Sequence, residues 1–360
     1  MKINMVQILK RLTSLVPLVF LSLAVCASAF GQAQGEDSSG GQRRFHIYLQ
    51  DLQVSDYGLS VYGGAESDSR PEKMIVRDDL HSYFYGNYVE VDMVVFNGQV
   101  IVRDGGVYIG ECFAKNYITR CRSDFSGKGI AHDETSAVNQ EAADDSLGRV
   151  VAVFNGPVKA LRLRAKNGGQ ALFNKAVTLS EGISLEGREA ETSLIFQGPV
   201  SLGSRSVKAF IILRGRSSVY FANEVGGNID GLLLNDADSR ASVTLAWPGQ
   251  LTVGEVKVLG QNRLIFSLER PMKAEPFIIS GPAEIDADCL VIDNPGNQAE
   301  EGAAITLITG WNIKLNGDRR KIVTKQGDEF ELLADGFRVS ARLVKRGQPL
   351  MWYDYLEFDF

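Results

Sequence analysis

The chain has 360 residues, of which 44% are hydrophobic and 23% charged, and its formal net charge is −6. A chain of this length can bury a continuous hydrophobic core, and its acidic balance argues against nucleic-acid phosphates as partners. It has only three histidines and four cysteines, with no metal-ligand spacing among them, so the sequence predicts no metal and no cofactor.

Residues 1–29 have the three parts of a secretory signal peptide. An apolar run over residues 15–25 precedes small residues that end at Ala29, and the positive start is formed by Lys2, Lys10 and Arg11. The run is shorter than the ~20 residues that a membrane-spanning helix needs. We expect cleavage after Ala29, which removes three positive charges and changes the net charge from −6 to −9. Lipid attachment at Cys26 is an alternative, but Val25 before it is not a small residue.

Two segments separate the signal peptide from the main part of the chain. Residues 30–44 are rich in Gly, Ser and Gln, which predicts a flexible linker. Residues 45–62 contain short alternating stretches such as His46–Leu49, which favour β-strands. We expect these strands to form an N-terminal cap or the first coil of a repeat structure.

A short motif centred on phenylalanine recurs along most of the chain. The sequence VVFNGQV around Phe96 returns as AVFNGPV around Phe154, ALFNKAV around Phe173, LIFQGPV around Phe196 and VYFANEV around Phe221. Weaker copies surround residues 245 and 266, and from 154 onward the equivalent positions are 19, 23, 25, 24 and 21 residues apart. A repeat of this length is one small unit that must stack on its neighbours to bury its apolar face.

The repeats consist of short apolar runs separated by Gly, Asn and Ser, and helical periodicity is nearly absent. We therefore predict an all-β protein, a single-stranded parallel β-helix over residues 45–328. Equivalent residues of successive coils then lie above one another, and the residue before each phenylalanine is also apolar or bulky, which favours core packing over a carbohydrate-stacking surface. We expect the Gly or Asn after each phenylalanine to turn the corner with left-handed or tight backbone. The predicted core aromatic ladder comprises Phe96, Phe154, Phe173, Phe196, Phe221 and Phe266.

An insertion interrupts the repeat between Phe96 and Phe154, which are 58 residues apart. We place an insertion loop at about residues 110–147, where an acidic, polar stretch contains almost no apolar residue. Insertions of solenoids often form the binding face, so any recognition site is expected in this loop and around its cysteines, although the composition favours a merely solvated, flexible loop. Cys112 and Cys121 lie in it, and after export they form either a local disulfide or two free thiols.

Paired aspartates are the only candidates for chemistry, because glycosidic bond cleavage uses two carboxylates. Spacing of i and i+2 places both members of a pair on one face of a strand. The residues around the first pair fit a turn better, and no nucleophile elbow or phosphate-binding loop occurs. The sequence thus assigns no catalytic residue and favours a protein that is not an enzyme, with a polysaccharide-active β-helix enzyme as the alternative. The pairs are Asp236 with Asp238, and Asp286 with Asp288.

Residues 329–360 are expected to form a C-terminal cap of antiparallel β-hairpins. Turns at Ala334–Gly336 and Lys345–Gly347 separate three strand-like runs, Glu329–Leu333, Phe337–Val344 and Leu350–Tyr355. A cap of this kind protects the open edge of the last coil from pairing with other chains.

The motifs around Phe154 and Phe173 and the segment Ala304–Gly310 resemble parts of bacterial autotransporter passenger domains. The resemblance covers about residues 90–350 and implies a right-handed β-helix on a Gram-negative surface, whose last coils nucleate folding. Autotransporters continue into a translocating β-barrel, whereas this chain ends at Phe360. The resemblance therefore implies an orphan passenger, a truncated gene, or a relative that uses another export route or a separate outer-membrane translocator.

Together these features predict an exported, non-enzymatic β-helical protein, secreted, on the outer cell surface, or periplasmic if it is not translocated further. Its expected action is adhesion or scaffold presentation, with a host or cell-surface glycan or protein as partner. An outer-membrane β-barrel is the remaining alternative, suggested by the terminal Phe358-Asp359-Phe360, although the short runs fit barrel strands poorly.

Overall fold

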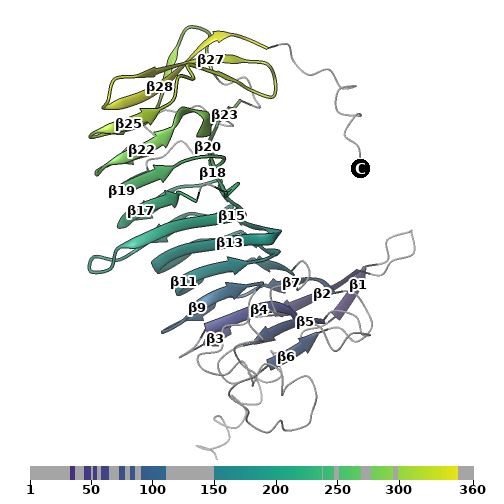
Figure 1. Cartoon of the computed structure of the whole chain (residues 1–360). Helices are drawn as coiled ribbons and strands as arrows, with labels where there is room; N and C mark the ends of the chain where they lie inside the picture. Colours follow the sequence, from purple (N-terminus) through teal and green to yellow (C-terminus); the bar gives the residue numbers. More distant parts are fainter. Residues whose placement is uncertain are drawn as a thin grey trace, which may run out of the picture.

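The strands of the computed structural model form one large, mostly parallel sheet that coils into a β-helix and does not close into a barrel (Figure 1). The only helix in the part of the chain that is described is the 3-10 helix η2 (Ala287–Cys289). No helix there is long and apolar enough to cross a membrane. The structure describes residues 33–36, 44–49, 52–54, 58–64, 73–77, 82–85, 91–110, 150–236, 238–246, 251–268, 277–294 and 299–347.

The coiled sheet has three faces, and each coil contributes strands to all three; we call each face a sheet. The sheet that carries the phenylalanines, here the Phe sheet, contains β2 (Arg44–Leu49), β7 (Val91–Phe96), β10 (Val150–Phe154), β12 (Gly169–Phe173), the end of β13 (Val177–Phe196), the end of β15 (Ala209–Phe221), β18 (Ser242–Leu245), β20 (Arg263–Ser267) and β23 (Leu290–Asp293).

The chain turns from the Phe sheet into a second sheet and then into a third. The second sheet contains β3 (Leu52–Val54), β8 (Val100–Val102), the starts of β11 (Val158–Lys166) and β13, β14 (Val200–Leu202), β16 (Val225–Gly227), the start of β19 (Leu251–Val258) and β21 (Phe277–Ile279). The third contains β4 (Gly58–Gly64), β9 (Gly106–Ile109), the end of β11, the middle of β13, the start of β15, β17 (Ile229–Leu234), the end of β19, β22 (Ala283–Asp286) and β25 (Ile313–Asn316).

The phenylalanines of successive coils stack inside the coil. The ring centroids of Phe96, Phe154, Phe173, Phe196 and Phe221 are separated by 4.6, 4.7, 4.8 and 5.2 Å, with interplanar angles of 4° to 13°. These separations follow from the ~4.8 Å spacing of paired strands. In-register pairing continues the column through Leu245 to Phe266, which is fully buried but separated by that leucine from the stacked rings.

The corner that follows each phenylalanine does not have the left-handed backbone at asparagine that was one of the two expected conformations. Within the described residues, the only non-glycine residues with positive φ are Asn167 and Asn312, so the corner asparagines are not left-handed. They form a ladder instead, in which the Asn155 amide donates to Asn97 Oδ1 (2.9 Å) and the Asn174 amide donates to Asn155 Oδ1 (2.7 Å). Side-chain pairing between coils therefore explains asparagine at this position.

Glycine at the same corner is required by close approach between coils. A Cβ atom added to Gly156 would lie 2.0 Å from the Gly98 carbonyl oxygen, and one added to Gly198 would lie 2.4 Å from the Lys175 carbonyl carbon. Left-handed glycines occur at the next corner, after the second sheet, for example Gly203 with φ of 76°.

Antiparallel strands cover the N-terminal edge of the coil. β1 (Ala33–Glu36) lies within the segment expected to be a flexible linker and pairs with β2, so that expectation does not hold for these residues. β5 (Lys73–Arg77) pairs with β4 and with β6 (Ser82–Tyr85), a hairpin extension that the repeat did not predict. Both additions satisfy the backbone groups that the first parallel strands would leave unpaired.

At the C-terminal end the coil changes into an antiparallel cap. The predicted hairpin is formed by β27 (Glu329–Ala334) and β28 (Arg338–Lys345). Two further strands contribute: β26 (Lys321–Val323) pairs with β27, and β24 (Ala304–Gly310) pairs with β21 in parallel and with β28 antiparallel. The cap thus begins before residue 329, and the third strand expected at 350–355 lies outside the described residues.

A buried carboxylate fastens the cap to the last coil. Asp328 is 1% exposed and accepts hydrogen bonds from the Asn294 amide (2.8 Å) and from the Gly347 backbone N–H (2.7 Å). Asn294 follows β23 in the Phe sheet, Asp328 directly precedes β27, and Gly347 follows β28. The Asp328 side chain therefore joins the corner after β23 to the start and the end of the β27–β28 hairpin. Hydrogen bonds to a charged group are stronger than neutral ones.

Candidate functional site

The first aspartate pair forms a turn, as its sequence suggested. Asp236 and Asp238 are exposed and lie between β17 and β18. The carboxylate of Asp236 accepts the backbone N–H of Asp238 (3.3 Å), and its carbonyl accepts the N–H of Ser239 (3.1 Å). This carboxylate therefore has a structural role in stabilising the turn.

The second pair does not share a strand face, which corrects the prediction from spacing. Asp286 ends β22, and Asp288 lies in η2, where the backbone leaves the extended conformation. Asp286 accepts hydrogen bonds from the Gly260 N–H (2.8 Å) and the Asn316 amide (3.1 Å). Asp288 has a side chain that is 75% exposed, and its nearest cation is Arg319 at 3.8 Å. The two carboxylates thus occupy different environments and do not converge on one point.

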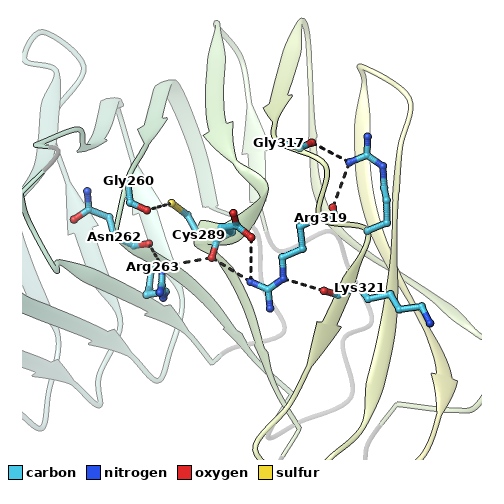
Figure 2. A network of polar contacts seen from close by, with 9 residues as sticks. Gly260, Asn262, Arg263, Cys289, Gly317, Arg319 and Lys321 are labelled. Atoms are coloured by element: carbon cyan, nitrogen blue, oxygen red, sulfur yellow. Dashed lines mark hydrogen bonds and ion pairs between the residues drawn. The ribbon is translucent and has the colours of Figure 1, made fainter.

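The polar network around η2 connects the last coils to the start of the cap (Figure 2). Arg263 and Arg319 both donate to the carbonyl oxygen of Asp288, at 3.4 and 3.3 Å. Arg319 also donates through Nε to the Lys321 carbonyl at 2.9 Å. Buried Asn262 donates to three backbone carbonyls and accepts the Ala241 N–H, so its amide fixes the corner before β20. Most of these bonds end on backbone atoms, and the network therefore holds the fold together.

Cys289 contributes a thiol to this region, and we predict that it is unreactive in the folded protein. It is fully buried, its Sγ donates to the Gly260 carbonyl (3.4 Å), and burial raises the pKa of the thiol to about 11. At pH 8 only about one molecule in a thousand then carries the reactive thiolate. Labelling with iodoacetamide, followed by peptide mass mapping, should leave Cys289 unmodified in native protein and modify it in guanidinium. Equal labelling rates in both conditions would contradict this assignment.

The outer surface of the third sheet is strongly charged. Four ion pairs with N–O distances of 2.6 to 2.9 Å follow one another along it or at its edge: Arg162–Glu181, Lys208–Asp230, Lys257–Glu255 and Lys314–Glu284. Hydrogen bonds from Lys314 and Asn316 lower the pKa of Glu284, so this carboxyl stays ionised at neutral pH. Exposed pairs of this kind contribute little to stability, and their main effect is a hydrated, charged surface.

The outer surface of the Phe sheet is uncharged by contrast from β10 to β18, and we call this part the Phe-sheet outer face. It is formed by the side chains that alternate with the buried ones on β10, β12, the end of β13, the end of β15 and β18. All of them are apolar, hydroxyl-bearing or amide-bearing: Val151, Val153, Gln170, Leu172, Ser193, Ile195, Ser218, Tyr220, Ser242 and Thr244.

Two exposed aromatic residues stand at the edge of the cap. Trp311 is 71% exposed and Phe337 is 58% exposed, and their rings meet edge to face with centroids 5.8 Å apart. Backbone hydrogen bonds hold the two turns together, from Gly310 N to the Phe337 carbonyl and from Ile313 N to the Gly336 carbonyl, both at 2.9 Å. We call these two residues the aromatic pair. Rigid, exposed aromatic rings are typical of binding surfaces.

Several predicted features lie outside the described residues, among them the signal peptide, Cys112, Cys121 and nearly all of the insertion loop. The strands on either side of that loop are β9, which aligns with the end of β11 in the third sheet, and β10, which aligns with β7 in the Phe sheet. Among the residues the structure describes, no group of three or more His, Cys, Asp or Glu side chains could hold a metal ion.

Comparison with protein-family models, with curated proteins and with solved structures found no match. The interpretation of the surface therefore depends on the geometry and chemistry of this chain alone.

Sequence reasoning missed both uncharged features of the surface, although part of the signal was present. The apolar or bulky residues before the phenylalanines, such as Val153, Ile195 and Tyr220, entered the sequence-based prediction only as an argument for core packing of the rings. The structure places them on the outside, because side chains alternate along a strand. Their recurrence in every repeat could have indicated an outer apolar column. The aromatic pair had no local signal, because its residues are 26 positions apart in sequence.

Proposed function

We propose that this chain is an exported β-helical protein, secreted or displayed on the cell surface, that acts by adhesion or scaffold presentation without catalysis. The hydrophobic core is one cluster that extends from Val54 to Leu343, so the coil is a long and rigid support. The observation that carries the proposal is the aromatic pair, which two hydrogen-bonded turns display at the end of this support. The signal-peptide pattern and the passenger-like repeats support export.

The aromatic pair suits contact with a cell-surface glycan or protein. The indole of Trp311 offers a large apolar surface, and its two side-chain torsions cost little entropy when they are fixed on binding. Tryptophan is also among the residues that contribute most to binding energy at interfaces. The acidic carboxylates that could have supported chemistry, Asp236 and Asp286, already accept hydrogen bonds from the backbone.

Replacement of Trp311 by alanine should weaken binding to glycan arrays or intact cells at least 10-fold, because the exposed indole is lost. Its side chain is 71% exposed, so the fold should remain intact and the unfolding midpoint should change little. Val207→Ala is the matched control, since Val207 is also an exposed apolar residue but lies at the distant β14–β15 connection. Unchanged binding by the Trp311 variant would remove the main support for an adhesive role.

Catalysis is tested on the same preparation. The purified chain should release no new reducing ends or unsaturated products from a panel of polysaccharides. Turnover that is lost in an Asp286→Asn variant, while the unfolding midpoint is retained, would overturn the non-enzymatic proposal in favour of a polysaccharide-active enzyme.

A further inference from the structure

The Phe-sheet outer face carries a column of mostly apolar side chains along the coil axis, and this column extends beyond the face onto β20 and β23. Strand pairing aligns Val153, Leu172, Ile195 and Tyr220 in register, and continues the column through Thr244, Ile265 and Val291. Each of these side chains is opposite in direction to its buried neighbours, and each is partly exposed, with Ile195 the most exposed of the named apolar positions at 38%. Val95, at the N-terminal end of the same column, is 5% exposed, so the accessible part begins at Val153.

We infer that this face binds a second copy of the chain, face to face. The inference deepens the proposed function, on which it rests, because contact between identical copies is one way in which a displayed solenoid can adhere. The first argument is electrostatic. The chain has a net charge of −6, so two copies repel one another on average. From β10 to β18 the outward side chains that form the Phe-sheet outer face include no charged residue, so this repulsion is weak there.

The second argument is area. The column crosses seven strands from β10 to β23, with a strand spacing of ~4.8 Å, which gives a length of roughly 30–35 Å. With the flanking polar columns the face is roughly 20 Å wide, so each copy would bury roughly 700 Å², within the range of stable interfaces. From β10 to β18 both flanking columns are uncharged, with Ser193, Ser218 and Ser242 on one side and the asparagine ladder with Gln197 on the other. Farther along the column, Arg263 of β20 and Asp293 of β23 take the flanking positions.

The third argument is the match between repeating surfaces. A sheet that packs on this face must place its own side chains between rows that recur at the strand spacing. A second copy offers an apolar column with the same spacing and length. In a two-fold arrangement, each contact between a residue of one copy and a residue of the other occurs a second time with the copies exchanged. A smaller globular partner would leave most of the column exposed. The serine and glutamine side chains beside the column supply the polar rim that such interfaces have.

Sedimentation velocity of the full exported chain tests the inference, with Ile195→Lys as the disruptive variant. The wild-type protein should shift from monomer to dimer as its concentration rises to about 100 µM. The lysine places an unpaired charge in the middle of the face, and the apparent Kd should rise at least 100-fold. Ser201→Lys is the matched control, because Ser201 is exposed on the second sheet of the neighbouring β14 strand. It should associate as the wild type does.

Unchanged unfolding midpoints for both variants would show that the fold is intact, which is expected because both side chains point outward. A wild-type chain that stays monomeric at 100 µM would overturn the inference. So would an Ile195→Lys variant that still dimerises, or a Ser201→Lys variant that loses dimerisation to the same degree. Should Ile195→Lys fail to fold, Ile195→Ser provides the same comparison without a new charge, with an expected loss of at least 10-fold.

The outcome is separable from that of the proposed function. Binding to glycans or cells that persists in monomeric Ile195→Lys protein, together with a monomeric wild type, would reject self-association and leave adhesion standing. The opposite result is a wild type that dimerises but binds no glycan and no cell without this protein. It would support self-association and reject the proposed binding role of the aromatic pair.

Discussion

Replacement of Phe173 by alanine is expected to lower the free energy of unfolding by about 3–5 kcal/mol. Its ring is fully buried and stacks on Phe154 at 4.7 Å and on Phe196 at 4.8 Å, so the deletion leaves a cavity between two aromatic faces. Strand pairing fixes the distance between those neighbours, and the coil therefore cannot collapse into the space. Urea unfolding followed by far-ultraviolet circular dichroism measures the change.

Two control substitutions give this prediction its specificity. Phe173→Leu should cost less than half as much, because the chain itself places Leu245 between Phe221 and Phe266 in the same column. Lys175→Ala, at an exposed position two residues away, should stay within about 0.5 kcal/mol of the wild type. A loss below about 1 kcal/mol for Phe173→Ala would show that the stacked column is not a principal source of stability.

Replacement of Gly198 by alanine should destabilise the coil by about 1–3 kcal/mol or more, although only one methyl group is added. The new Cβ would lie 2.4 Å from the carbonyl carbon and oxygen of Lys175, which are backbone atoms and cannot rotate away. Gly198 has no positive φ, so its own backbone conformation is compatible with alanine. Neighbouring coils must therefore separate at this corner, and the urea midpoint should fall.

Gly226→Ala is the matched control, because a Cβ at Gly226 would have no atom within 4 Å and φ is again not positive. Its stability should be unchanged or slightly higher, since alanine restricts the unfolded chain. Equal effects at the two positions would contradict the assignment of Gly198 to close packing between coils.

The repeat predicted the fold because a parallel coil gives equivalent residues equivalent environments. Phenylalanines at positions 154, 173, 196 and 221 recur at intervals of 19, 23 and 25 residues, and these unequal intervals are absorbed by corners while the strands stay in register. The hairpin of β27 and β28 was also predictable, because both its strands and its turn are local in sequence. Features that are local or periodic in sequence can therefore be predicted from a single sequence.

The direction of side chains was harder to predict than the strands themselves. Apolar residues on both sides of a strand look alike in sequence, so the outward direction of Ile195 and Tyr220 was not predicted beside the buried Phe196 and Phe221. Of the two backbone conformations expected at the corners, left-handed or tight, the left-handed one does not occur at Asn155 and Asn174, whose side chains pair between neighbouring coils. The asparagine pairing joins residues of neighbouring coils, and the outward direction of Ile195 and Tyr220 depends on which side of each strand faces the coil interior.

The sequence by itself determined that this protein is a solenoid of short strands, that phenylalanines fill its interior, and that a hairpin closes its C-terminal end. Only the tertiary structure decided which acidic residues pair, which apolar column faces outward, and that Trp311 meets Phe337. The physical reason is the separation in sequence of the residues that interact. Strand propensity and the repeat period can be recognised from residues close together in sequence. Ion pairs, outer faces and turn contacts depend instead on how far each coil rotates and on where the cap folds back.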